Sequence, residues 1–161
     1  FREGAALFLS GEYAAGARRI RGMGSGLTPS GDDFLAGALY GFLLDSRLSG
    51  RNREASCRAI LDNALGGNIF SNTSLYLAYR GIPFASLQAL LVALLQGKKE
   101  SLAEIVQHVL SFGHTSGADL LTGMVLLLER LETVSGPPDL PINTQGVSHA
   151  YTGIHKEGGV L

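Results

Sequence analysis

The feature that most constrains the fold of this chain is a pattern that occurs twice, Ser-Gly-x-Asp-apolar-Leu-x-Gly. One copy begins at Ser30 and the other at Ser116. In each copy a serine is followed three residues later by an acid, which is a capping-box spacing with Asp replacing the usual Glu or Gln. We expect each serine oxygen to accept from a first-turn N–H, and Pro29 to occupy the first helical position of the first copy. Both copies therefore predict helix N-termini.

Capping does not account for the glycines of the repeat. Gly31 and Gly117 fall in a first helical turn, where glycine costs about 0.5–1 kcal/mol relative to alanine. A glycine is useful there if a ligand or another backbone approaches closely. Gly37 and Gly123 lack bulk further along each helix, so we expect the two helices to pack closely as a pseudo-symmetric pair. Their N-termini would then lie near one another.

The rest of the chain also has helical spacing of apolar residues and almost no strand pattern. Besides a short helix around residues 5–9, the sequence predicts helices over residues 13–20, 29–45, 53–65, 73–79, 84–96, 102–112 and 116–133. We predict an all-α fold, a multi-helix bundle or orthogonal array, with a helical domain over residues 1–134. Residues 135–161 are expected to form an extended tail or linker, in which His149 and His155 would be exposed to solvent.

Composition limits the classes of partner. The formal net charge is −1, with 13 basic and 14 acidic residues, which gives no footprint for nucleic acid or for an anionic membrane. The single cysteine, Cys57, excludes an internal disulfide and is interpreted as a small buried apolar residue. The longest apolar run, residues 34–44, is well short of the ~20 residues that span a bilayer. We therefore expect a soluble, cytoplasmic protein without a nucleic-acid or membrane partner.

Two converging helix N-termini would form a site for a small anionic substrate, because their N–H groups and positive dipole ends attract carboxylate or phosphate. A third run of polar residues, 71–74, reads as another helix start and adds donors if it converges with the other two. The expected substrate-binding residues are Gly24, Gly26, Thr28, Ser30, Gly31, Asn72, Thr73, Thr115, Ser116 and Gly117. The simpler alternative is that the motifs only cap helices.

Four side chains are candidates for catalysis. Asp32, Asp33 and Asp119 would hold the loops, bind an amino group or collect a cation. His114 precedes a helix N-terminus, where the dipole disfavours its protonation, so it is a candidate neutral hydrogen-bond donor or general base. A loop anchor is an equally good interpretation of this histidine.

Known cofactor motifs are absent from the sequence. The run Gly22-x-Gly24-x-Gly26 is not a dinucleotide fingerprint, because residue 27 is Leu and no strand precedes it. It is not a P-loop either, since no Gly-Lys-Ser/Thr follows. No helix face carries His, Asp and Glu at metal-ligand spacing. We expect neither a cofactor nor a metal ion.

Two segments together, residues 24–33 and 113–119, resemble the AllH-like family, which includes a subunit assigned to oxamate carbamoyltransferase. The resemblance covers roughly residues 21–130. It implies transfer of a carbamoyl group between carbamoyl phosphate and oxamate in anaerobic allantoin breakdown, a branch of purine catabolism, with other protein subunits as partners. It also implies that this helical part follows a strand-rich half, so that the chain would be the C-terminal part of a longer α/β protein.

The family motif carries over onto most of the candidate residues. The matching positions are Gly24, Gly26, Thr28, Ser30, Asp32, Asp33, His114, Thr115, Ser116, Gly117 and Asp119. Ser25 stands where the family often has proline, and neither motif contains an arginine clamp, for which Arg21 is the nearest candidate. Two other interpretations remain open: a non-catalytic assembly subunit and, ranked lower, a metal-dependent hydrolase that uses the three aspartates.

Overall fold

The computed structural model describes residues 1–135, which form eight helices and no strand. The helices are α1 (Arg2–Ser10), α2 (Tyr13–Ile20), α3 (Ser30–Ser49), α4 (Glu54–Ala64), α5 (Ile69–Tyr79), α6 (Ala85–Leu95), α7 (Leu102–Leu110) and α8 (Ser116–Ser135). The prediction of an all-α fold is confirmed for this part of the chain. The predicted tail, with His149 and His155, lies outside the described residues except for Ser135, which ends α8.

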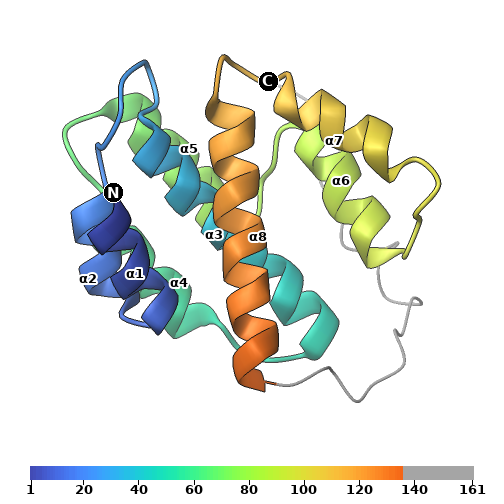
Figure 1. Cartoon of the computed structure of the whole chain (residues 1–161), viewed down its shortest axis with the longest axis horizontal. Helices are drawn as coiled ribbons and strands as arrows, with labels where there is room; N and C mark the ends of the chain where they lie inside the picture. Colours follow the sequence, from blue (N-terminus) through green and yellow to red (C-terminus); the bar gives the residue numbers. More distant parts are fainter. Residues whose placement is uncertain (136–161) are drawn as a thin grey trace, which may run out of the picture.

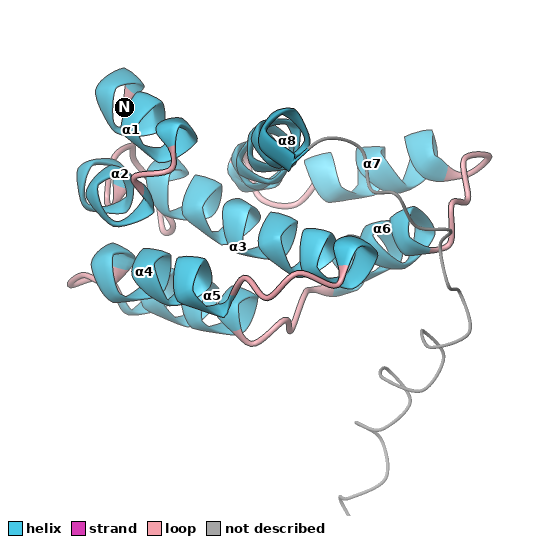
Figure 2. Cartoon of the chain, turned by 90° about the horizontal axis from the view of Figure 1, so that it is seen from below, coloured by secondary structure: helices cyan, strands magenta, loops and turns pink. Residues whose placement is uncertain are grey.

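The central helix of the fold is α3. It is buried on nearly every side from Gly31 to Phe42, because apolar and small residues surround its whole circumference. Figure 2 shows α3 between α8 on one side and α4 and α5 on the other. In Figure 1 the remaining helices flank this centre, with α1, α2 and α4 to one side and α6 and α7 to the other.

α3 and α8 cross at the glycines of the repeat. A β-carbon on Gly37 would lie 1.8 Å from the carbonyl oxygen of Leu120, and one on Gly123 would lie 1.9 Å from that of Phe34. Phe34 and Leu120 occupy the same position of the repeat, so the two contacts are reciprocal and relate the helices by a local two-fold pseudo-symmetry. Backbones can touch in this way only without a β-carbon. The predicted pairing of the two copies is present in the structure.

The first helical turn of α3 differs from the predicted capping box. Ser30 is itself the first helical residue, Pro29 precedes the helix, and no side chain caps it. The backbone satisfies this turn instead, since the N–H of Gly31 donates to the carbonyl oxygen of Met23 at 2.8 Å and that of Asp32 to Pro29 at 2.9 Å. The capping-box prediction is therefore wrong for α3, and so is the helical position of Pro29.

α5 begins earlier than the predicted residue 73. The side chain of Asn68 accepts hydrogen bonds from the N–H groups of Phe70 and Ser71, which places the helix cap at Asn68. Residues 71–74 consequently lie inside the helix and are not its start. In the described residues, no helix is long and apolar enough to cross a membrane.

Candidate functional site

A groove of about 1260 Å³ opens where the two helix starts of the repeat face α5. Its polar end is formed by the loop before α3 and the loop before α8. Its apolar half is lined by α3, α5 and the segments around α6 and α8. The lining residues are Ser25, Gly26, Leu27, Thr28, Ser30, Asp33, Tyr40, Ile69, Phe70, Thr73, Ser74, Leu77, Ile82, Phe84, Phe112, Gly113, His114, Thr115, Ser116 and Leu120.

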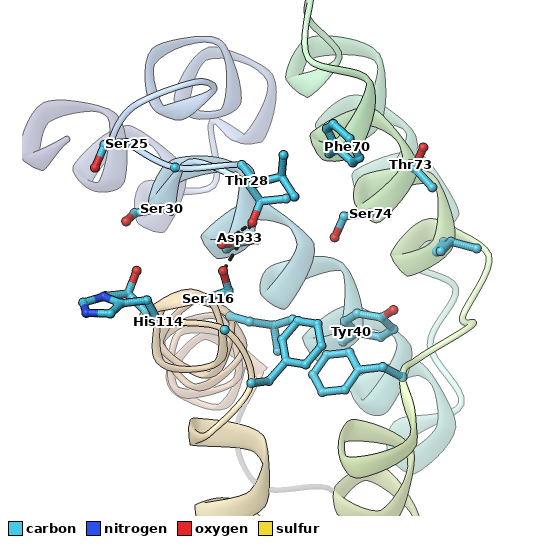
Figure 3. A pocket seen from close by; sticks show the side chains of 18 of the residues that line it. Ser25, Thr28, Ser30, Asp33, Tyr40, Phe70, Thr73, Ser74, His114 and Ser116 are labelled. Atoms are coloured by element: carbon cyan, nitrogen blue, oxygen red, sulfur yellow. Dashed lines mark hydrogen bonds between the residues drawn. The ribbon is translucent and has the colours of Figure 1, made fainter.

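The two copies of the repeat meet at the polar end of the groove. The hydroxyl oxygen of Thr28 lies 3.2 Å from that of Ser116, within hydrogen-bonding distance, and the same Thr28 hydroxyl donates to Oδ2 of Asp33 at 3.0 Å. Figure 3 shows these three side chains converging, with Ser30 and His114 on the same side of the groove. Residues far apart in the sequence therefore build one polar cluster, because the glycine contacts hold the two N-termini together.

The structural repeat extends upstream of the sequence motif. Met23 closes a turn on Ile20, and Phe112 closes the same turn on Val109. Each of these turn residues then accepts a hydrogen bond from the glycine of its own motif, Gly31 at 2.8 Å and Gly117 at 3.0 Å. The two helix starts thus share a backbone frame in which the preceding helix end is tied to the first turn of the next.

Each frame contains a glycine in the left-handed region directly after the turn residue. Gly24 has φ 111° and Gly113 has φ 64°. A β-carbon on Gly24 would lie 2.8 Å from the backbone nitrogen of Ser30, and one on Gly113 would lie 3.2 Å from Oγ of Ser116. A side chain at either glycine would therefore crowd the first serine of the helix that follows.

Some backbone donors at the helix starts have no partner. No described residue accepts a hydrogen bond from the N–H groups of Ser30, Ser116 or Ala118. Unpaired N–H groups in a first turn, together with the positive end of the helix dipole, are suited to an anion. The polar end therefore offers N–H and hydroxyl donors from both copies.

Asp33 is the acidic group of this cluster. It is only 5% exposed, and desolvation by burial raises the pKa of its carboxyl above the ordinary value of 3.8. Hydrogen bonds from Ser116 and Thr28 oppose this shift, and the charges of Asp119 and Asp32 add to it. Asp119, the equivalent residue of the second copy, has a buried Oδ2 without a hydrogen-bond partner among the described residues. The site consequently combines N–H and hydroxyl donors with a buried carboxyl group whose pKa is raised.

Several predicted site residues lie outside the groove. Gly31 and Gly117 are buried under backbone, because their β-carbons would lie 2.1 Å from the carbonyl oxygen of Ile20 and 2.0 Å from that of Val109. Close packing on another backbone thus explains both glycines, and neither is evidence for a bound ligand. Asp32 is buried, and its Oδ1 accepts from the N–H of Gly22 at 2.7 Å, which holds the loop before α3.

Four further candidates also lie outside the groove lining. Asn72 exchanges two hydrogen bonds with the backbone of Gly66, donating to its carbonyl oxygen and accepting from its N–H. Arg21 donates to the carbonyl oxygen of Leu65 at 3.0 Å and is not part of the groove lining, so it is not placed as a clamp. Asp119 and Gly24 lie close to the polar end without lining the groove.

The other predicted residues do line the groove. They are Gly26, Thr28, Ser30, Asp33, Thr73, His114, Thr115 and Ser116. Thr73 is the only one of the eight on α5, and its hydroxyl donates to the carbonyl oxygen of Ile69 in its own helix. The loop before α8 carries His114 and Thr115, both exposed. The structure therefore brings most of the polar candidates together at one end.

The site residues predicted from the sequence do not include the apolar half of the groove. Tyr40 contributes its ring, and its hydroxyl donates to the carbonyl oxygen of Ile82 at 2.9 Å. Phe84 and Phe112 stack with their ring centroids 4.1 Å apart. The sequence offers one signal for this surface, the adjacent apolar residues Ile69 and Phe70 at a helix start. Both side chains are exposed in the structure.

Other reactive groups are placed elsewhere. Among the described residues, no group of three or more His, Cys, Asp or Glu side chains is arranged to hold a metal ion. Cys57 lies half-buried against the core beside α5, and burial raises the pKa of its thiol to about 11, which keeps it protonated. A metal-dependent hydrolase centre at the three aspartates thus finds no support in the described part of the chain.

Comparison with known proteins identifies the family. No curated protein and no solved structure is significantly similar to this chain. The family described as oxamate carbamoyltransferase subunit AllH matches residues 20–128, which include both motifs and the whole polar end of the groove. That match spans more than half of the chain, and a family of subunits implies other protein partners. The chain belongs to the family of oxamate carbamoyltransferase subunit AllH.

Proposed function

We propose that this chain is a subunit of a carbamoyltransferase and that the polar end of its groove binds the anionic substrates, oxamate and carbamoyl phosphate. The observation that carries the proposal is the meeting of the two family motifs at Thr28, Asp33 and Ser116. Packing requires the glycines of both motifs, but it does not require hydroxyl groups from both helix starts to face a groove. Their convergence there is what a binding site needs.

The donors of the site match the substrates. A carboxylate or phosphate oxygen can accept from the free N–H groups of Ser30, Ser116 and Ala118 and from the hydroxyl groups beside them. A side chain at Gly24 or Gly113 would crowd the first serine of each helix, where such an oxygen would bind. Preorganised donors of this kind also stabilise negative charge that develops during group transfer.

Asp33 would act as the general base. In carbamoyl transfer the amide nitrogen of oxamate forms a bond to the carbamoyl carbon, the bond from that carbon to the phosphate oxygen breaks, and phosphate leaves. The nitrogen must lose a proton, and a carboxylate in the groove can accept it. Burial raises the pKa of Asp33, which brings it closer to the operating range of a base near neutral pH. His114, on the opposite loop, lines the same groove and would hydrogen-bond the departing phosphate.

One observation favours a second candidate, a non-catalytic assembly subunit. Such a subunit requires a large exposed apolar surface, and the groove has one beside its polar end. The two functions are compatible in one chain, because the polar and apolar parts of the groove involve different residues.

The test is the activity of the assembled enzyme with Asp33→Asn. We expect kcat to fall by about 10²–10⁴-fold, the usual contribution of a general base. The variant subunit should still assemble and melt within a few degrees of the wild type. Asp62→Asn is the matched control, because Asp62 is exposed and pairs only with Arg58 at a distance from the groove. Full activity of Asp33→Asn would overturn the assignment of Asp33, and loss of folding would make it structural.

A further inference from the structure

The apolar half of the groove exposes large side chains that a solvated surface does not explain. Ile69 is 72% exposed, Leu27 65%, Phe70 54% and Phe112 48%, and all four line the same groove. They come from the loop before α3, the start of α5 and the turn before α8. Contiguous apolar surface of this kind marks a place where another molecule is bound.

The groove is too large for the proposed substrates alone. Its volume of about 1260 Å³ exceeds the ~300–1,000 Å³ of typical small-molecule sites, whereas oxamate and carbamoyl phosphate are smaller than drug-sized ligands and fully polar. They have no apolar group to place against Phe70, Phe84 or Phe112. A second occupant is needed to cover this half.

The charged residues in and near the groove indicate which charge the second occupant carries. The lining contains a carboxyl group, Asp33, with Asp32 and Asp119 close enough to influence it, and no lysine or arginine. Arg21 is directed to Leu65 instead. Two anionic substrates bound beside these aspartates call for a permanent positive charge, and none of the lining residues is a lysine or an arginine.

We propose that the apolar half of the groove is the docking site for a segment of another subunit of the enzyme, with large apolar side chains and a basic side chain that reaches the polar end. The apolar side chains would pack between α5 and the Phe84–Phe112 stack, in the manner of a segment laid into a hydrophobic groove. The basic group would complement Asp33 and its neighbours and neutralise the bound substrates. This inference rests on the proposed function, since the anionic substrates help to define the missing charge.

The experiment is photo-crosslinking in the assembled enzyme. Benzoylphenylalanine replaces Ile69 in one sample and Val134 in the other, a matched control that is 62% exposed near the end of α8 and outside the groove. We expect position 69 to crosslink to a peptide of a different subunit that contains apolar residues and an arginine or lysine, and position 134 not to reach that peptide. A crosslink from position 69 to a second copy of this chain, or none at all, would overturn the proposal.

A companion variant separates this inference from the proposed function. The double change Ile69→Ser and Phe70→Ser removes exposed apolar groups and should leave the chain folded. We expect it to reduce co-purification with the other subunits at least tenfold, whereas Val125→Ser with Val134→Ser should not. Retained assembly of the groove variant would contradict docking. Oxamate binding is measured on the assembled wild-type enzyme, in which the basic group of the other subunit is present. Its absence there would count against the proposed function and not against docking.

Discussion

The two helix starts of the repeat share one backbone frame and differ in the side chains that occupy it. In both, a turn closes the preceding helix, a left-handed glycine follows, and a buried glycine rests on that helix end. The loop that follows is longer in the first copy, with residues 25–29 where the second has only His114 and Thr115. Asp32, which ties the longer loop, is replaced by Ala118. The shared glycines serve packing, the shared Ser30 and Ser116 line the groove, and the unmatched Asp32 holds the longer loop.

The strongest test of the shared frame is alanine at the helix crossing. Gly37→Ala and Gly123→Ala each place a β-carbon within 2 Å of a carbonyl oxygen, so α3 and α8 must separate. We expect each change to lower the free energy of unfolding by about 3 kcal/mol or more, the upper range for overpacking. Gly67→Ala is the control, because nothing lies within 4 Å of its β-carbon position. Urea denaturation measures all three, and a large cost in only one helix would contradict the reciprocal packing.

A second pair of substitutions should cost unequal amounts of stability in the two copies of the repeat. Gly31→Ala meets the end of α2, which packs against α1, α3 and α4, whereas Gly117→Ala meets α7, which packs mainly on α6 and α8. The less restrained α7 can shift to relieve the clash. We therefore expect a loss of about 2–3 kcal/mol for Gly31→Ala and about 1 kcal/mol for Gly117→Ala, within the usual range for overpacking. Equal losses would show that α7 is held as firmly as α2.

Asp33 should give the protein a pH dependence that Asp33→Asn removes. Its pKa in the folded state is raised above 3.8, so the folded state holds this proton more tightly than the unfolded state does. The stabilising contribution of the proton is complete below pH 3.8 and is lost as the pH rises through the folded-state pKa. Urea unfolding between pH 3.5 and 8 should show this decline in the wild type and a flatter profile in Asp33→Asn. An unchanged profile would contradict the assignment.

The smallest expected effect concerns the hydrogen bond that joins the two copies. Thr28→Val removes the donor to Asp33 and the contact with Ser116. We expect a loss of about 1 kcal/mol, typical of one hydrogen bond. The pKa of Asp33 should rise further, because the Thr28 hydroxyl favours the ionised carboxylate. The pH profile of unfolding would then move to higher pH, and a shift to lower pH would contradict the described contact.

Much of this arrangement could be predicted from the sequence. Helical periodicity located α2 and the starts of α3, α7 and α8 to within a residue, and the small residues of the repeat predicted the pairing of α3 with α8. The meeting of Thr28 with Ser116 follows from that pairing. The roles of Gly31 and Gly117 could not be predicted, because a glycine that contacts a ligand and a glycine that contacts a backbone have the same sequence pattern. The role of Asn72 could not be predicted either, since an asparagine that lines a pocket looks the same in sequence as one that anchors a loop.

The apolar half of the groove shows a second limit of sequence reasoning. Ile69 and Phe70 look like core residues in a one-dimensional pattern, but the folded chain leaves both of them exposed. The upstream part of the repeat was also missed. Met23-Gly24 and Phe112-Gly113 share a backbone geometry, but they share only the glycine in sequence.

The most direct test of the paired-helix site is a titration with oxamate of the assembled enzyme in which only this chain is isotopically labelled, followed by the amide resonances in NMR spectra. The largest saturable shifts should occur at Ser30, Ser116 and Ala118, the free N–H groups of both copies. Thr28→Val should weaken this response, and Thr133→Val, at the far end of α8, should not. Binding that shifts only one copy, or shifts resonances elsewhere and leaves these three unchanged, would contradict a site built from both helix starts.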